Sequence, residues 1–338
     1  MDSPSPSPMK PNHHAGRAIA LGVLVICFII AGWILFNRQY IVDQLMVWQY
    51  QPTREVESIA TRAKLSDHGQ FYFYASQPQV DEADVFNQQC RKQEEHSAIL
   101  GCYSARRIYI YNVSNDKLEG IKEVTAAHEM LHAAWDRLSP QEKKHLEPLL
   151  EKVYSRVATT ELRDRMAYYE RTQPGEKYNE LHSIIGTEVS GVGSDLEQYY
   201  AQYFTDRQQV TSMHQRYESV FTQLKLEADS LVTQLTSLAA EIDQQTVAYN
   251  AAVTQLNADI SSFNDRATQT GGFSSQAAFN AERSRLLTAS GDLEAQRAAI
   301  NDMITRYNQL RTELEAINAQ SAALTQSIDS TLAPAPSI

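Results

Sequence analysis

The pattern of hydrophobic and polar positions divides the chain into three parts. Residues 18–36 form an uninterrupted apolar run, "AIALGVLVICFIIAGWILF", which as a helix is long enough to cross the hydrocarbon layer of a membrane. From 37 to 206, amphipathic segments alternate with short aromatic runs, and from 207 to 329 apolar residues recur at regular spacing. We therefore expect one N-terminal transmembrane helix, a mixed domain and a long helical region.

The flanks of the apolar run indicate its orientation. Residues 1–17 form a Pro/Ser-rich segment with Lys10 and Arg17, and "LFNRQY" at the end of the run lacks the small-x-small pattern of a cleaved signal peptide. Positive charge is somewhat heavier on the N-terminal side, which favours a cytoplasmic tail. We predict a single-pass membrane protein with an uncleaved anchor and an extracytoplasmic C-terminal body.

The cysteines fit this location. Cys27 lies inside the apolar run, whereas Cys90 and Cys102 enclose a short loop. Outside the cytoplasm a disulfide between them would contribute roughly 3 kcal/mol to stability. The alternative is a pair of unrelated thiols.

The mixed domain, 37–206, carries more helix signals than strand signals. Aromatic and β-branched runs at 71–76 ("FYFYAS") and 107–113 ("RIYIYNV") are typical of strands. Ser139, with Pro140 at the next position and Glu142 three residues on, forms a capping box, so one helix ends near Leu138 and another begins. The pattern predicts an α+β domain that is mostly helical.

The third part, 207–329, has a seven-residue repeat of apolar positions. In its second half six of seven positions spaced seven apart are apolar or aromatic, from Leu286 to Ile328, and Gly271–Gly272 interrupts the repeat within 268–275. Two long helices joined by a glycine turn predict an antiparallel coiled-coil hairpin, which could pair with a second copy or another coiled-coil partner. The alternative is a helical bundle folded onto the preceding domain. Residues 330–338 are expected to be a disordered tail.

Charge narrows the range of partners. The formal net charge is -11, and no basic patch is interleaved with aromatic residues, so a nucleic-acid partner is excluded.

The stretch "TAAHEMLHAAWDRL", 125–138, carries the most specific chemistry. His128 and His132 are four apart and project from the same face of a helix, so both can bind one metal ion. Glu129 can reach a water on that metal and accept its proton without being a ligand. The neighbouring residues are small or apolar, as a buried helix requires. The competing interpretation is two histidines that merely pack on a helix face.

With this motif the sequence resembles the zincin metallopeptidases, over about residues 105 to 190. The resemblance implies an α+β fold with an edge strand above the active-site helix, one Zn²⁺ per chain, and a third ligand downstream. The astacin-like pattern would need glycine at Trp135 and histidine at Leu138, so the thermolysin-like (gluzincin) type is preferred.

In the thermolysin-like type a later helix supplies a glutamate as third ligand. Asn179–Glu180-x-x-Ser183 is similar to that stretch of the family, which implies Glu180, while Glu188 is the alternative. Where the family has an aspartate that orients a histidine, this chain has Ile184, so Asp136 is a candidate for that role. The oxyanion donor stays open; candidates are His182, Tyr178, Tyr199, Tyr200 and Tyr203.

Two functions follow. The first is a membrane-anchored zinc peptidase that acts on proteins or peptides, with Glu129 as general base. The second is a non-catalytic membrane-tethered coiled-coil scaffold with a structural zincin-like domain. The glutamate at position 129 favours the enzyme, because a scaffold has no chemical need for it.

Overall fold

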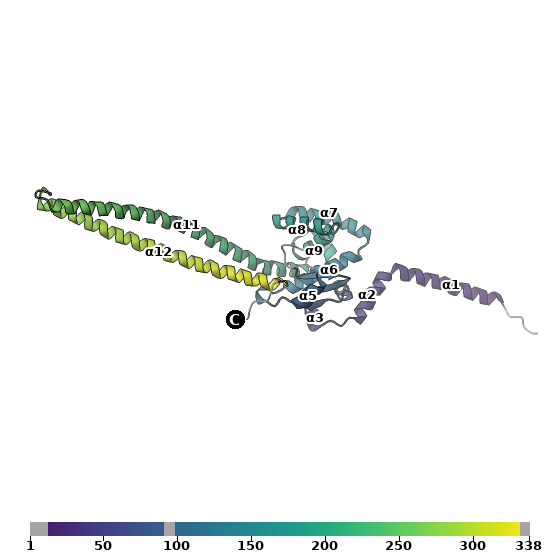
Figure 1. The fold of residues 1–338 in the computed structure, drawn as a ribbon. Coiled ribbons are helices and arrows are strands. Elements are labelled where there is room, and N and C mark those ends of the chain that lie inside the picture. The colour runs from purple at the N-terminus through teal and green to yellow at the C-terminus, as the bar shows by residue number, and fades with distance from the viewer. Residues whose placement is uncertain (1–12, 91–98, 332–338) are drawn as a thin grey trace, which may run out of the picture. The chain divides into compact units, whose positions relative to one another are not determined.

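The computed structural model describes residues 13–90 and 99–331, with side chains from Gly22 onward. Helices predominate and the strands are few and short (Figure 1). The elements in chain order are α1 (His13–Phe36), α2 (Arg38–Gln49), α3 (Arg54–Arg62), α4 (Asp67–Ala75), β1 (Gln79–Asp81), α5 (Ala83–Gln89), β2 (Gly101–Ser104), β3 (Arg107–Tyr111), the 3₁₀ turn η1 (Asp116–Leu118), α6 (Ile121–Arg137), α7 (Pro140–Val157), α8 (Thr160–Thr172), α9 (Lys177–Thr187), α10 (Ser194–Tyr200), α11 (Arg207–Ala267) and α12 (Gln276–Ile328).

The chain forms two compact units. Among the described residues, the first runs to Tyr217 and includes 328–331, and the second is Glu218–Ser327. Helix α11 begins at Arg207, within the first unit. Ser330, at the start of the expected tail, is buried and exchanges two 2.7 Å hydrogen bonds with Asn87. The rest of that tail, 332–338, and residues 1–12 of the expected N-terminal tail lie outside the described residues.

A small sheet lies beside the central helix of the first unit. Its strand order is β1-β3-β2, with β1 parallel and β2 antiparallel to β3. The strand predicted from "RIYIYNV" is confirmed as β3, whose Ile108 and Ile110 are fully buried. Strand β2 is an edge strand of this sheet, and α6 packs against both β2 and β3.

Helix α6 is the centre of the core. It packs on α3, α4 and α9 as well as on the sheet, and its four alanines at 126, 127, 133 and 134 are completely buried. The predicted boundary after it is confirmed: Ser139 and Glu142 form a reciprocal capping box, and α7 begins with Pro140. The expectation of a mostly helical α+β fold is thus confirmed.

The strand predicted at 71–76 is wrong, because this run lies in α4. Ser66 caps the helix by accepting a 3.1 Å hydrogen bond from the Gly69 amide. The aromatic side chains find partners all around the helix: Phe71 packs on Tyr40, Phe73 is buried in the core and Tyr74 packs on Tyr50. Packing on several sides therefore overrides the strand propensity of an aromatic run.

The N-terminal apolar run lies in α1. Among the residues whose side chains are described, no single helix is long and apolar enough to cross a membrane, and one bent pair, Gly22–Phe36 with Arg38–Gln49 at 73°, meets the criterion by length and composition. The first four residues of the predicted anchor, 18–21, lie outside these residues.

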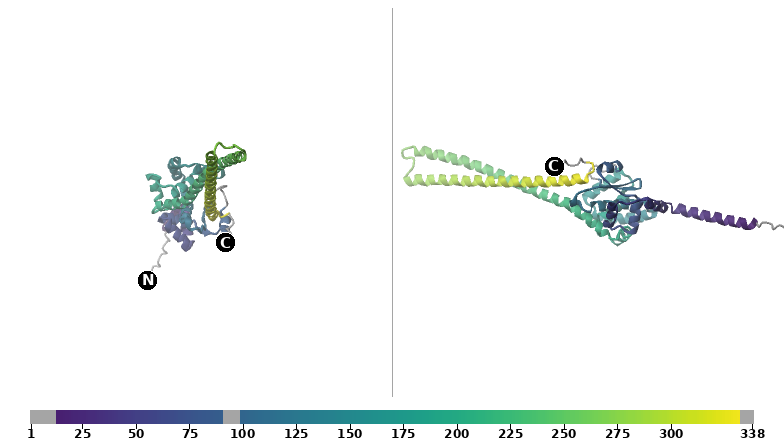
Figure 2. Two further views of the ribbon diagram at one scale, coloured as in Figure 1. Left: turned by 90° about the vertical axis from the view of Figure 1, so that its left-hand side faces the viewer. Right: turned by 90° about the horizontal axis from the view of Figure 1, so that it is seen from below.

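The second unit consists of the paired parts of α11 and α12. Leu231 and Leu235 pack with Leu310, Asp259 pairs with Arg285 at 3.0 Å, and Arg266 pairs with Glu282. In these contacts, residues farther along α11 meet residues nearer the start of α12. The two helices are therefore antiparallel, as Figure 2 also shows. Helix α11 ends at Ala267 and α12 begins at Gln276, so the break between the two helices falls at 268–275.

Candidate metal centre and active site

Helix α6 presents His128, Glu129 and His132 from a rigid base. The side-chain hydroxyl of Thr125 donates to the Ile121 carbonyl at 2.8 Å, and the buried alanines let neighbouring elements approach closely. The two imidazole rings meet edge to face, with ring centroids 4.8 Å apart and planes inclined at 72°. The four-residue spacing therefore places both rings on one helix face, as helix geometry requires.

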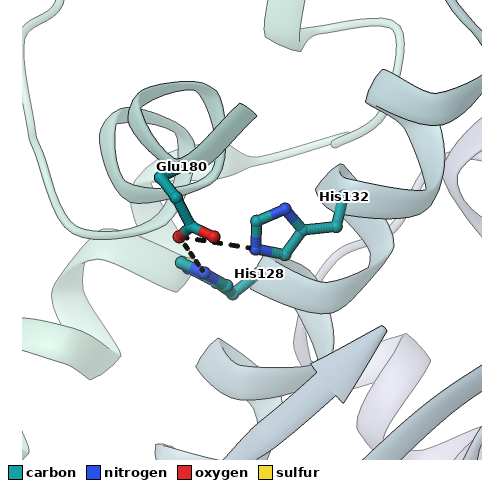
Figure 3. A group of neighbouring side chains, drawn as sticks. All are labelled: His128, His132 and Glu180. Atoms are coloured by element: carbon teal, nitrogen blue, oxygen red, sulfur yellow. Dashed lines mark ion pairs between the residues drawn. The ribbon is translucent and has the colours of Figure 1, made fainter. Parts of the chain in front are cut away.

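Helix α9 brings a third candidate ligand, Glu180, to this face. A Cβ on Gly186 would lie 2.3 Å from Leu131 Cδ1, so any larger residue there would force Leu131 to move where α9 approaches α6. Glu180, one turn into α9, is 7% exposed. Its carboxylate Oε2 lies 3.7 Å from His132 Nε2 and 4.0 Å from His128 Nε2 (Figure 3).

These three side chains fit a metal ion. One ligand atom from each of His128, His132 and Glu180 lies within 4.8 Å of the other two. Ligands of a tetrahedral zinc ion at 2.0–2.1 Å are about 3.3 Å apart, so a small inward movement would complete the coordination. Two imidazole nitrogens and one carboxylate oxygen form a donor set typical of catalytic zinc.

Asn179 orients one of the histidines. Its Oδ1 lies 2.9 Å from His132 Nδ1, and its own amide donates to Glu176 Oε2 at 2.8 Å. Because Asn179 Oδ1 can only accept, His132 Nδ1 carries a proton, and Nε2 is the ring nitrogen that faces Glu180. Sequence reasoning missed this role, although Asn179 belongs to the motif that pointed to Glu180.

Asp136, which the sequence suggested for orienting a histidine, contacts other residues. It is exposed, accepts a 3.2 Å hydrogen bond from the Tyr103 hydroxyl and lies 3.7 Å from Arg106. Asn179, from α9, contacts His132 instead.

Glu129 is enclosed between α6 and the edge strand β2. It is 6% exposed, and its carboxylate accepts a hydrogen bond from the backbone N–H of Tyr103. A Cβ on Gly101 would lie 3.0 Å from Glu129 Oε1 and 2.5 Å from Thr125 Cγ2. Burial raises the pKa of Glu129 to about 7, with the Glu180 carboxylate adding to the rise, which is suitable for a general base at neutral pH.

The two histidines have opposite pKa shifts. Burial lowers the pKa of His128 well below its usual value, and the neighbouring His132 lowers it further. Burial also lowers the pKa of His132, but the carboxylates of Glu180 and Glu129 outweigh burial and raise it overall. A neutral imidazole is the form that binds a metal, and His128 is held in that form.

An open pocket of about 780 Å³ leads to these groups. Its lining comes from Cys90, Ile99 and the edge strand β2, from α6, and from α7, the end of α8 and the start of α9. The residues from these last three helices include Lys143, Glu147, Tyr169, Glu176 and Tyr178. His128, Glu129, His132 and Glu180 all line the same pocket, so a substrate in it can reach each of them.

The alternative ligand Glu188 lies apart from this group. It ends α9 and pairs with Arg165 at 2.8 Å and with His214 at 3.7 Å. Glu180 and Glu188 are eight residues apart, about 12 Å along a helix axis, so both carboxylates cannot bind the same ion. The structure brings Glu180 to the histidines and turns Glu188 to a different partner.

Most of the candidate oxyanion donors are in the core. His182 is fully buried, contacts the Tyr199 hydroxyl at 2.9 Å, and has its pKa lowered to about 3 by burial. The Tyr200 hydroxyl donates to the His182 carbonyl at 2.7 Å, and Tyr203 is buried beside them. Of the five candidates, Tyr178 lines the pocket.

Cys90 and Cys102 form a disulfide with a Cα–Cα distance of 5.8 Å. Cys102 belongs to β2 and Cys90 follows α5 directly, so the bond ties the edge strand to α5 along one wall of the pocket.

In comparisons with known proteins, no family model, no curated protein and no solved structure matches this chain.

Proposed function

We propose that this protein is a zinc-dependent metallopeptidase. The observation that carries the proposal is the convergence of His128, His132 and Glu180 within 4.8 Å, beside a buried Glu129 in an open pocket. The two histidines and Glu180 hold the metal. When bound, zinc lowers the pKa of a coordinated water toward neutrality and polarises the substrate carbonyl.

The side chains around the proposed metal site support the proton transfers and the orientation of the ligands that hydrolysis needs. Glu129, with its pKa near neutrality, accepts the proton of the attacking water and can return it to the leaving amine. Asn179 keeps the His132 ring in one tautomer and orientation. The edge strand keeps Glu129 in place through the Tyr103 N–H.

A peptide is the substrate that this pocket favours. The Tyr111 N–H donates to the Leu100 carbonyl at 2.8 Å, and in an antiparallel pair alternate residues exchange bonds. The backbone groups of Gly101 and Tyr103 therefore point away from β3, and apart from the Tyr103 N–H, which donates to Glu129, they remain open at this edge within the described part of the chain. An extended peptide could add to this edge as a further strand, with its scissile bond near the metal.

The finer fold and the location are part of the same proposal. The first unit is a zincin-like domain of the thermolysin-like type, and α11 with α12 form a coiled-coil hairpin that binds a partner or a second copy. Residues 18–36 anchor the chain in a membrane with the body outside the cytoplasm. The disulfide supports this side of the membrane, because such bonds persist in oxidising compartments.

The test compares the purified full-length chain with its Glu129→Gln variant. We expect about one zinc per chain in both proteins, hydrolysis of a quenched fluorescent peptide library by the wild type, and at least about 100-fold slower hydrolysis by the variant. Equal hydrolysis by both proteins, or no stoichiometric metal in the wild type, would contradict the proposal. Metal without any hydrolysis by the wild type would favour the non-catalytic scaffold.

A further inference from the structure

A buried ion pair joins α2 to the end of the active-site helix. Arg137, the last residue of α6, donates to Asp43 from Nη2 at 2.7 Å and from Nε at 2.9 Å, and their side chains are only 2% and 3% exposed. Gln39 Nε2 donates to both Asp43 oxygens, at 3.0 and 2.9 Å. A buried, bidentate arginine–carboxylate pair of this kind has a well-defined geometry.

The same arginine holds the side chain of Tyr103 on the edge strand. Arg137 Nη1 donates to the Tyr103 hydroxyl at 3.3 Å and to the Ala133 carbonyl at 2.7 Å. The hydroxyl in turn donates to Asp136 Oδ2 at 3.2 Å. Tyr103 is therefore fixed at its side chain by α6 residues that lie beyond the metal-binding turn.

At its backbone, Tyr103 contacts the proposed general base. Its N–H donates to the Glu129 carboxylate, and the close approach of Gly101 to Glu129 shows independently that β2 lies against this carboxylate. A chain of contacts thus runs from α2 through Arg137 and Tyr103 to Glu129.

We propose that Tyr103, held by the buried Arg137–Asp43 pair, is a positioning residue that fixes the edge strand β2 and, through its backbone N–H, the orientation of Glu129. This inference rests on the proposed peptidase function for its kinetic consequences only. Helix α2 thus helps to orient the proposed general base through Asp43, although none of its residues lines the pocket.

Two consequences follow for the reaction. A loosened β2 gives Glu129 more orientations, which lowers kcat, and disturbs the free strand edge proposed to bind the peptide, which raises KM for long peptides. The metal ligands are held by separate contacts from α6 and α9, so zinc binding does not depend on this chain of contacts.

Hydrogen exchange tests the inference without any assay of activity. In the full-length wild type, Tyr103→Phe and Asp43→Asn, amide exchange is followed in β2 (101–104) and β3 (107–111). We expect about tenfold or faster exchange at the Tyr103 amide in both variants, as the loss of one hydrogen bond to a charged group implies, with β3 amides unchanged. Tyr111→Phe, whose ring packs on Phe86, is the matched control and should exchange like the wild type.

A double-mutant cycle on peptide hydrolysis tests the coupling. Tyr103→Phe and Asp43→Asn should each lower kcat/KM by about tenfold with one zinc per chain retained, and the double variant should lose little more, because both act through Arg137. Unchanged β2 exchange in Tyr103→Phe overturns the inference, as do additive losses in the cycle. If Asp43→Asn fails to fold, Tyr103→Phe with its Tyr111→Phe control decides alone. If the wild type binds zinc but hydrolyses no peptide, the peptidase proposal fails. The hydrogen-exchange result then decides alone whether Tyr103 positions β2.

Discussion

Asn179 Oδ1 lies 2.9 Å from His132 Nδ1, while the next residue, Glu180, faces Nε2 of the same ring at 3.7 Å. Adjacent residues of α9 thus contact opposite sides of one imidazole. Asn179 determines which nitrogen carries the proton, and Glu180 completes the group of three side chains that could hold a metal ion. The short helix α9 therefore supplies both the third candidate ligand and the residue that orients His132.

Replacing Asn179 should weaken metal binding without removing a ligand. In Asn179→Ala the His132 ring can rotate and change tautomer, so we expect zinc affinity to fall by about 10- to 100-fold. Competition with a chromogenic chelator measures this. Asn112→Ala, which removes a surface amide bonded to Glu82, is the control and should bind zinc like the wild type. Equal affinities in both variants would show that Asn179 does not orient the ligand.

The two glutamates of α9 should behave oppositely. Glu180→Gln removes a ligand and should abolish stoichiometric zinc binding, whereas Glu188→Gln should keep one zinc per chain, because Glu188 pairs with Arg165 instead. Metal analysis after dialysis distinguishes the variants. Zinc lost in Glu188→Gln and kept in Glu180→Gln would reverse the assignment.

The sequence predicts those features of the site that depend on spacing along one helix. The four-residue interval fixes His128 and His132 on one face, and the Ser139–Glu142 capping box fixes the end of α6, because both depend only on local geometry. The choice between Glu180 and Glu188 could be ranked but not decided from the sequence. It depends on how α9 packs on α6, which places Glu180 against the histidines and Glu188 against Arg165.

Other features required the fold itself. The run at 71–76 has the composition of a strand, and only its partners on several sides explain why it is a helix. Asp43 and Arg137 are 94 positions apart, and nothing in either local sequence indicates that they meet. Long-range ion pairs of this kind have no periodic signature, so sequence patterns cannot reveal them.

Adding a methyl group at Gly101 should impair catalysis while the metal stays bound. The new Cβ would lie 2.5 Å from Thr125 Cγ2 and 3.0 Å from Glu129 Oε1, so β2 or the side chains of Thr125 and Glu129 must move. We expect Gly101→Ala to lower kcat/KM by roughly 10- to 100-fold, the cost of a small misplacement of a catalytic group.

A second substitution can relieve part of this clash. Thr125→Ser removes the Cγ2 methyl but keeps the hydroxyl that donates to Ile121. Gly101→Ala with Thr125→Ser should therefore recover part of the lost kcat/KM, measured with the same peptide. Gly101→Ala activity equal to the wild type would show that the strand does not constrain Glu129.

The stability of the metal-free protein should depend on pH through Glu129. Burial raises the pKa of its carboxyl from 4.5 to about 7 in the folded state, so between these values the folded protein binds more protons than the unfolded chain. The Glu129 contribution is fully present below pH 4.5 and is lost as pH rises through about 7, a change of roughly 3 kcal/mol. Glu129→Gln cannot titrate, so its unfolding free energy relative to the chelator-treated wild type should increase from pH 4.5 to 7.5. Urea unfolding at several pH values measures this difference, and parallel profiles for the two proteins would show that Glu129 is not held in a desolvated site.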